Sequence, residues 1–199
     1  MILTFSASAM HKILLLLGLL RLRPMYGYEL HQIIQAHGEL YSDLKKANLY
    51  YLLERLAKEG YLRVQAMPGA RGSRGERLIY DITDQGRKRF NELLHEIMLN
   101  YEPVHIGVET AVIFLEQVPT SEAIALLVKR REIVAEHRTK VAKQLETIRG
   151  SGPMMHIASD HLLSLIDAEL AWIDRSVTYL LRLEDASKPR HQRRVAETE

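Results

Sequence analysis

The fold is decided by residues 45–83, which read KKANLYYLLERLAKEGYLRVQAMPGARGSRGERLIYDIT. The leucines of the first part recur at helical spacing and predict one apolar stripe: Leu49, Leu52, Leu53 and Leu56. Ser42 or Asp43 can serve as the N-cap of this helix, and Gly60 as its C-terminal cap. Residues 61–66 and 77–82 have strand chemistry and flank a glycine-rich turn, so they predict a β-hairpin.

The residues before this stretch predict two more helices. Residues 11–22 are apolar on all sides, which is typical of a buried helix. Pro24 suits the start of a second helix that runs through Gln35 and is closed by Gly38. Three short helices followed by a hairpin form a winged helix-turn-helix, in which the hairpin is the wing. Thr83 or Asp84 then caps another helix, which continues to Ile97.

The rest of the chain predicts an antiparallel helical hairpin. Residues 108–115 form a short helix, a longer one runs from residue 120 to about 148, and residues 150–153 break it. A final helix runs from about His156 to Leu183. A lone hairpin cannot bury both of its faces, so we expect a second copy to pair with it. The candidate dimer contacts are Leu127, Val134, Val141, Leu162, Leu165, Ile173, Val177 and Leu180. Arg131 and Arg138 interrupt the stripe, where they either set the register or face solvent.

The predicted fold class is mainly α (α+β), with two domains. Residues 10–100 form the winged helix-turn-helix DNA-binding domain, and residues 101–187 a helical dimerisation or effector domain. Residues 1–9 and 188–199 are expected to be flexible termini, and Met10 is an alternative start to Met1.

The net charge of +2 hides two opposite halves. Residues 1–90 hold 14 Lys and Arg against 8 Asp and Glu, a net +6, and residues 91–199 hold 13 against 17, a net −4. A basic module joined to an acidic one is typical of a nucleic-acid-binding domain tied to another function, although unevenly charged solvent surface gives the same count.

The composition also excludes several classes of protein. The absence of cysteine excludes disulfides, thiolate catalysis and cysteine-ligated zinc. The apolar run at residues 13–20 is far shorter than the ~20 residues of a membrane span, and we expect a cytoplasmic protein.

Cationic and amide side chains on the third helix and the wing predict contacts with double-stranded DNA. Lysine and arginine bind phosphates, asparagine can pair bidentately with adenine, and arginines on a glycine-rich arm can enter a narrow minor groove. Either tyrosine of the pair on the third helix can instead be half-buried in the core, and the wing arginines can simply be solvated. The candidates are Lys45, Lys46, Asn48, Tyr50, Tyr51, Arg55, Arg71, Arg74 and Arg77.

Three blocks of the sequence resemble the PadR family of bacterial transcriptional regulators. Residues 24–30, Pro-Met-Tyr-Gly-Tyr-Glu-Leu, are similar to its Gly-Pro-x-His-Gly-Tyr-Glu-Leu signature, with Tyr26 where histidine is usual. Residues 48–62 resemble its recognition helix and wing entry, and residues 77–86 the return strand of its wing. The chain departs from the family at residues 45–48, where Lys-Lys-Ala-Asn replaces a run of small residues.

The resemblance implies a homodimeric DNA-binding repressor that recognises a pseudo-palindromic operator. Some members release DNA on binding planar aromatic or drug-like molecules, so a small aromatic effector is a further expected partner. Trp172, Tyr101 and His105 are the candidate effector residues, although a lone tryptophan more often packs in a core or dimer contact. No cofactor or metal is expected.

Two other function classes fit the sequence less well. An enzyme is disfavoured because the histidines are scattered, His95-Glu96 lacks the second histidine of a zincin helix, and no phosphate-binding glycine loop is present. A winged helix that binds protein and no DNA remains the alternative, but it leaves Lys45, Lys46, Arg71 and Arg74 without a purpose.

Overall fold

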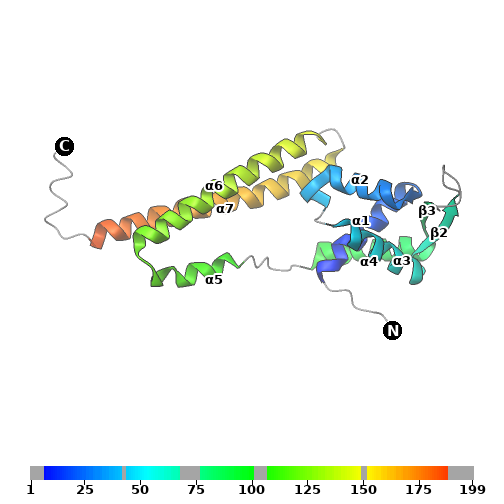
Figure 1. The fold of residues 1–199 in the computed structure, drawn as a ribbon, viewed down its shortest axis with the longest axis horizontal. Helices are drawn as coiled ribbons and strands as arrows, with labels where there is room; N and C mark the ends of the chain where they lie inside the picture. Colours follow the sequence, from blue (N-terminus) through cyan, green and yellow to red (C-terminus); the bar gives the residue numbers. More distant parts are fainter. Residues whose placement is uncertain (1–6, 42–43, 68–76, 101–106, 149–151, 188–199) are drawn as a thin grey trace. The chain divides into compact units, whose positions relative to one another are not determined.

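The computed structural model describes residues 7–41, 44–67, 77–100, 107–148 and 152–187 (Figure 1). The chain divides into two compact units, Met1–Glu102 and Pro103–Glu199. The first unit is a helical domain with a small sheet, and the second consists of helices. The predicted fold class, mainly α with a winged helix-turn-helix, is confirmed.

The first unit contains the elements of a winged helix-turn-helix. Its helices are α1 (Ala7–Leu22), α2 (Gly27–His37), the 3-10 turn η1 (Gly38–Tyr41), α3 (Lys46–Lys58) and α4 (Asp84–Leu99). Its strands are β1 (Met25–Tyr26), β2 (Leu62–Met67) and β3 (Arg77–Ile82), in the order β1-β3-β2 with both pairs antiparallel. The wing hairpin is in register from Leu62 opposite Ile82 to Met67 opposite Arg77.

Strand β1 corrects the prediction that Pro24 starts the second helix. Met25 is buried and pairs with Tyr80, and Tyr26 pairs with Ile79, so the chain stays extended until α2 begins at Gly27. The backbone N–H of Tyr26 donates to the Glu29 carboxylate at 2.7 Å, which satisfies one of the donors at the start of α2.

The core of the first unit is almost entirely leucine and isoleucine. The predicted buried helix is confirmed in part: α1 buries one face completely against α4 and β3, whereas Leu14 and Leu15 are half-buried and Leu22 is exposed. The predicted stripe of the third helix is confirmed as well: Leu49, Leu52, Leu53 and Leu56 are at most 7% exposed. Because one face of α3 is fixed in the core, its other face is held rigidly toward solvent.

The sequence predicts the C-terminal end of α3 correctly but not its N-terminal end. The predicted N-cap is wrong, because α3 begins at Lys46 with Lys45 as its N-cap, and residues 42–43 lie outside the described residues. The C-terminal prediction is confirmed: Gly60 has φ +81°, its N–H donates to the carbonyl of Ala57, and the N–H of Tyr61 donates to that of Leu56. This Schellman pattern ends the helix and turns the chain directly into β2.

Thr83 joins the root of the wing to α4. It is the N-cap of α4, as predicted, and its hydroxyl accepts from the N–H of Gly86 at 3.1 Å and donates to the carbonyl of Gly60 at 2.7 Å. A Cβ on Gly86 would lie 2.2 Å from the carbonyl oxygen of Tyr61, so only glycine allows α4 to approach the start of the wing this closely.

The second unit is built on a long helical hairpin. It contains α5 (Val108–Ile113), the 3-10 turn η3 (Phe114–Gln117), α6 (Thr120–Glu146) and α7 (Pro153–Ser187), and α6 and α7 lie side by side (Figure 1). Helix α7 starts at Pro153, earlier than the predicted His156, because proline is favoured in the first turn. Among the described residues, no helix is both long and apolar enough to cross a membrane.

Three arginines of α6 pair with carboxylates of α7. Arg130 lies 2.7 Å from Glu169, Arg131 lies 2.6 Å from Asp174, and Arg138 binds Asp167 through two nitrogens. The hydrogen bond from Arg131 lowers the pKa of Asp174, and the one from Arg138 lowers the pKa of Asp167. The two arginines that interrupt the apolar stripe therefore pair across the hairpin of a single chain.

Candidate nucleic-acid interface

The solvent face of α3 carries most of the predicted DNA contacts. Lys45, Lys46 and Asn48 are exposed at its start, and Tyr51 is 62% exposed one turn later. These side chains lie opposite the buried leucine stripe, so the core and the polar face divide the helix as the sequence predicts. An exposed polar face on a helix anchored in this way is the arrangement that enters a major groove.

The N-terminus of α3 has an unusual charge distribution. The first turn holds no acidic residue, and the side chain of the N-cap, Lys45, makes no capping hydrogen bond. Neither Lys45 nor Lys46 forms an ion pair with a residue that the structure describes. The partial positive charge of the helix end and two lysines thus coincide, which makes this end attractive to a phosphate.

Tyr50 and Tyr51 have different environments although they are neighbours in sequence. The Tyr50 ring covers the start of α2, where a Cβ added to Gly27 would lie only 2.7 Å from it. Tyr80 stands close by: burial raises the pKa of Tyr80, and the nearness of Tyr50 raises it further. Tyr50 therefore helps to hold α3 against α2, whereas Tyr51 faces outward and lies beside Arg55, whose pKa it also raises.

Arg55 is already engaged within α3. Its Nε donates to the carboxylate of Glu59 at 2.8 Å, and this hydrogen bond raises the pKa of Arg55. Its side chain is only 28% exposed. A phosphate contact by Arg55 would have to share the guanidinium with Glu59.

The wing is described only near its root. Arg71 and Arg74 lie outside the described residues, and Arg77 begins β3 opposite Met67. The structure adds one cation that the sequence reasoning did not select: Arg63 on β2 is 66% exposed and pairs with Asp81 across the hairpin at 2.7 Å. Strand alternation was the available signal, since it places Arg63 on the face opposite the buried Leu62.

The effector candidates fall in the second unit or between the described segments. Trp172 is half-buried on α7 and borders two hollows against α5, lined in part by Val112, Glu109 and Glu116. Tyr101 and His105 lie outside the described residues. Within the described part of the chain, no group of three or more histidine, aspartate or glutamate side chains is placed to hold a metal ion.

The predicted dimer contacts are distributed over both faces of the α6–α7 hairpin. Three of them, Leu127, Val141 and Ile173, are at most 5% exposed within one chain, so the packing of α6 on α7 already covers them. Leu165 is 53% exposed and remains available to a second copy. The other four are half-buried: Val134, Leu162, Val177 and Leu180.

Comparison with known proteins relates this architecture to one family. Residues 16–92 match the model of the transcriptional regulator PadR-like family. Bacillus subtilis PadR in complex with operator DNA superposes with a TM-score of 0.67 at 17% identity, covering 84% of this chain and 98% of that chain. PadR of the same organism in complex with p-coumaric acid also superposes with a TM-score of 0.67 at 17% identity, and the match covers 89% of this chain and 98% of that chain. The PadR-like regulator BC1756 from Bacillus cereus superposes with a TM-score of 0.64 at 16% identity, and the match covers 86% of this chain and 98% of that chain. No curated protein matches the chain. At such identities the solved structures show a shared fold.

Proposed function

We propose that the chain, whose residues 16–92 match the PadR-like family of transcriptional regulators, is a homodimeric, ligand-responsive repressor of that family. Such a protein is a DNA-binding regulator of transcription, which is in line with the expectation that the chain is not an enzyme. A protein with this role would work in the cytoplasm, beside the DNA it regulates.

The observation that carries the proposal is the exposed, lysine-bearing start of α3. Its lysines and uncapped N–H groups can bind phosphate, while Asn48 and Tyr51 lie on the same outward face and can reach base edges. In a two-fold dimer, two such helices about 34 Å apart would enter successive major grooves of a pseudo-palindrome.

Dimer formation is supported by apolar surface that one copy of the second unit leaves uncovered. Ile133 on α6 and Leu165 on α7 are both more than half exposed on long helices. A bundle of helices from two chains would cover such side chains, as the hairpin alone cannot.

Control by an effector is supported by the hollows beside Trp172. Bacillus subtilis PadR was solved both with operator DNA and with p-coumaric acid, and we extend to this chain the idea that one fold binds both kinds of partner. A ligand that fits only one arrangement of the dimer would shift the population away from the spacing that DNA requires.

The proposal is tested by selecting bound duplexes from a random pool with the full-length chain and then titrating the enriched duplex at several salt concentrations. We expect a palindromic consensus, a dimer in gel filtration and an affinity that falls steeply with salt. Enriched duplexes are then screened against aromatic compounds for release. If no duplex is bound even at low salt, the DNA-binding role is wrong and the protein-interaction alternative takes its place.

A further inference from the structure

Helix α3 carries one acidic side chain in the middle of its outward face. With about 3.6 residues per turn, the residues that lie directly opposite the buried leucine stripe are Ala47, Tyr51, Glu54 and Lys58. All four are exposed. Glu54 is therefore as well placed to face a groove of DNA as the cationic and amide side chains that the sequence selected.

The carboxylate of Glu54 is not used to hold the helix together. Glu59 is paired with Arg55 at 2.8 Å, whereas Glu54 forms no ion pair with a residue that the structure describes. Even Lys58, four residues later on the same face, is not paired with it. On a surface that binds phosphates such a carboxylate lowers the affinity, because it repels the groups that the two lysines at the start of α3 attract.

A carboxylate can gain a hydrogen bond from a base in the major groove. An ionised carboxylate only accepts hydrogen bonds, so it needs a donor on the base edge. Cytosine offers its N4 amino group there, whereas guanine offers two acceptors, thymine one acceptor, and adenine an acceptor beside its donor. The side chain of Glu54 therefore favours cytosine and is repelled by guanine and thymine.

Glu54 is within reach of the groove that the start of α3 would enter. It follows Ala47 by two turns, which is about 10 Å along the helix axis or about three base pairs. Homeodomain recognition helices read bases from positions i, i+3, i+4 and i+7, and Ala47, Tyr51 and Glu54 stand at i, i+4 and i+7. The charge of Glu54 also raises the pKa of the buried Tyr80 on β3, so this carboxylate lies on the side of α3 toward the wing hairpin.

We propose that Glu54 is a specificity-determining residue, which accepts a hydrogen bond from the N4 amino group of a cytosine in each half-site of the operator. Its charge lowers the affinity for other sequences, so it selects by exclusion as well as by contact. The proposal rests on the proposed DNA-binding role and names one base pair that this role leaves open.

The test is a selection of bound duplexes from a random pool, run in parallel with the full-length chain and two variants. The unaltered chain should select a cytosine at one position of each half-site. Glu54→Gln should replace that cytosine by adenine, because a glutamine amide pairs with N6 and N7 of adenine. Glu54→Ala should reduce the preference at that position by about five- to tenfold. At low salt it should also bind unrelated duplexes about two- to fivefold more tightly, since one repulsive charge is gone.

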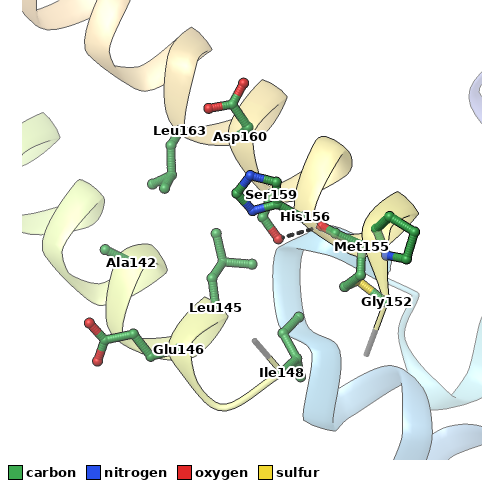
Figure 2. A pocket seen from close by; sticks show the side chains of 11 residues that line it. Ala142, Leu145, Glu146, Ile148, Gly152, Met155, His156, Ser159, Asp160 and Leu163 are labelled. Carbon is green, nitrogen blue, oxygen red and sulfur yellow. Dashed lines mark hydrogen bonds between the residues drawn. The ribbon is translucent and has the colours of Figure 1, made fainter. Parts of the chain in front are cut away.

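Glu146→Ala is the control for the change in net charge. Glu146 is the exposed last residue of α6 and borders a hollow at the closed end of the α6–α7 hairpin (Figure 2). Its replacement removes the same charge from the second unit and should leave the selected consensus unchanged. Circular dichroism verifies that each variant is folded.

Several outcomes overturn the proposal. It is wrong if both Glu54 variants select the same bases as the unaltered chain at every position. It is also wrong if Glu54→Ala weakens binding to all duplexes alike, because the carboxylate then acts by holding a neighbouring cation in place. If the unaltered chain selects no duplex at all, the proposed function fails and this inference fails with it. A consensus that the variants share overturns this inference alone.

Discussion

Replacing Lys46 by glutamate should make the protein more stable and make it bind DNA more weakly. Lys46 is the first residue of α3, beside an N-cap whose side chain makes no capping hydrogen bond. Helix N-termini favour acidic side chains by about 0.3–1 kcal/mol each. Removing one cation and adding one anion there should raise the free energy of unfolding by roughly 1 kcal/mol, equivalent to about 2–4 °C for a chain of this size.

The same change should impair DNA binding because a phosphate would then meet a carboxylate. Loss of one phosphate contact should make the plot of log association constant against log salt concentration less steep by about 0.9. Repulsion between the new carboxylate and the phosphate should lower the affinity further. Stability is measured by urea unfolding followed by circular dichroism, and affinity by fluorescence anisotropy on the selected duplex at four salt concentrations.

Lys58→Glu is the matched control, since it makes the same charge change at the opposite end of α3. Lysine is favourable in a last turn, so this variant should lose roughly 1 kcal/mol of stability. It should also weaken DNA binding less than Lys46→Glu does. The reasoning is refuted if Lys46→Glu destabilises the chain, or if the two variants weaken DNA binding equally.

Three further predictions concern the wing root, base reading and the hairpin. Gly86→Ala should destabilise the first unit by about 1–3 kcal/mol, because a Cβ would lie 2.2 Å from a backbone oxygen that cannot move alone, and a urea midpoint equal to that of Lys88→Ala would contradict this. Asn48→Ala should chiefly relax base preference in a repeated duplex selection, whereas uniform weakening of all sequences would assign Asn48 to the backbone. Arg131→Gln should lower the thermal stability of the second unit at pH 7, and this deficit should shrink as the pH falls. The pKa of Asp174 is lowered in the folded chain, so the stability that the pair contributes is present above the ordinary aspartate pKa and is lost as the pH falls through the folded value. A deficit that persists at pH 2 would show that Arg131 acts through packing.

Most of the fold could be predicted because short local patterns in the sequence indicate its helices and strands. The leucine stripe of α3, Gly60 at its end and the glycine-rich turn between two strands are all signals within a few residues. Strand β1 gave no such signal. It has two residues, and it exists because Met25 pairs with Tyr80, more than fifty positions away in the chain.

The site could be predicted less completely, since long-range packing decides what a side chain is free to do. Tyr50 and Tyr51 are the same residue type side by side, and only the approach of α2 to α3 at Gly27 separates a packing role from an outward one. The partner of Arg55 was within reach of the sequence, because Glu59 stands four residues later on the same helix. The pairing of Arg131 with Asp174 was not, because it depends on the register of two helices across a turn.

The family signature and the predicted specificity reside in different residues. The matching block, residues 24–30, builds the scaffold: Met25 and Leu30 are buried, Gly27 leaves room for Tyr50, and Glu29 binds the N–H of Tyr26. The departure from the family, Lys-Lys-Ala-Asn at residues 45–48, falls on the exposed start of α3. The resemblance to the family therefore predicts how α3 is held but not which bases it meets. An operator taken over from a relative would test the scaffold alone, whereas selection from a random pool tests the residues that differ.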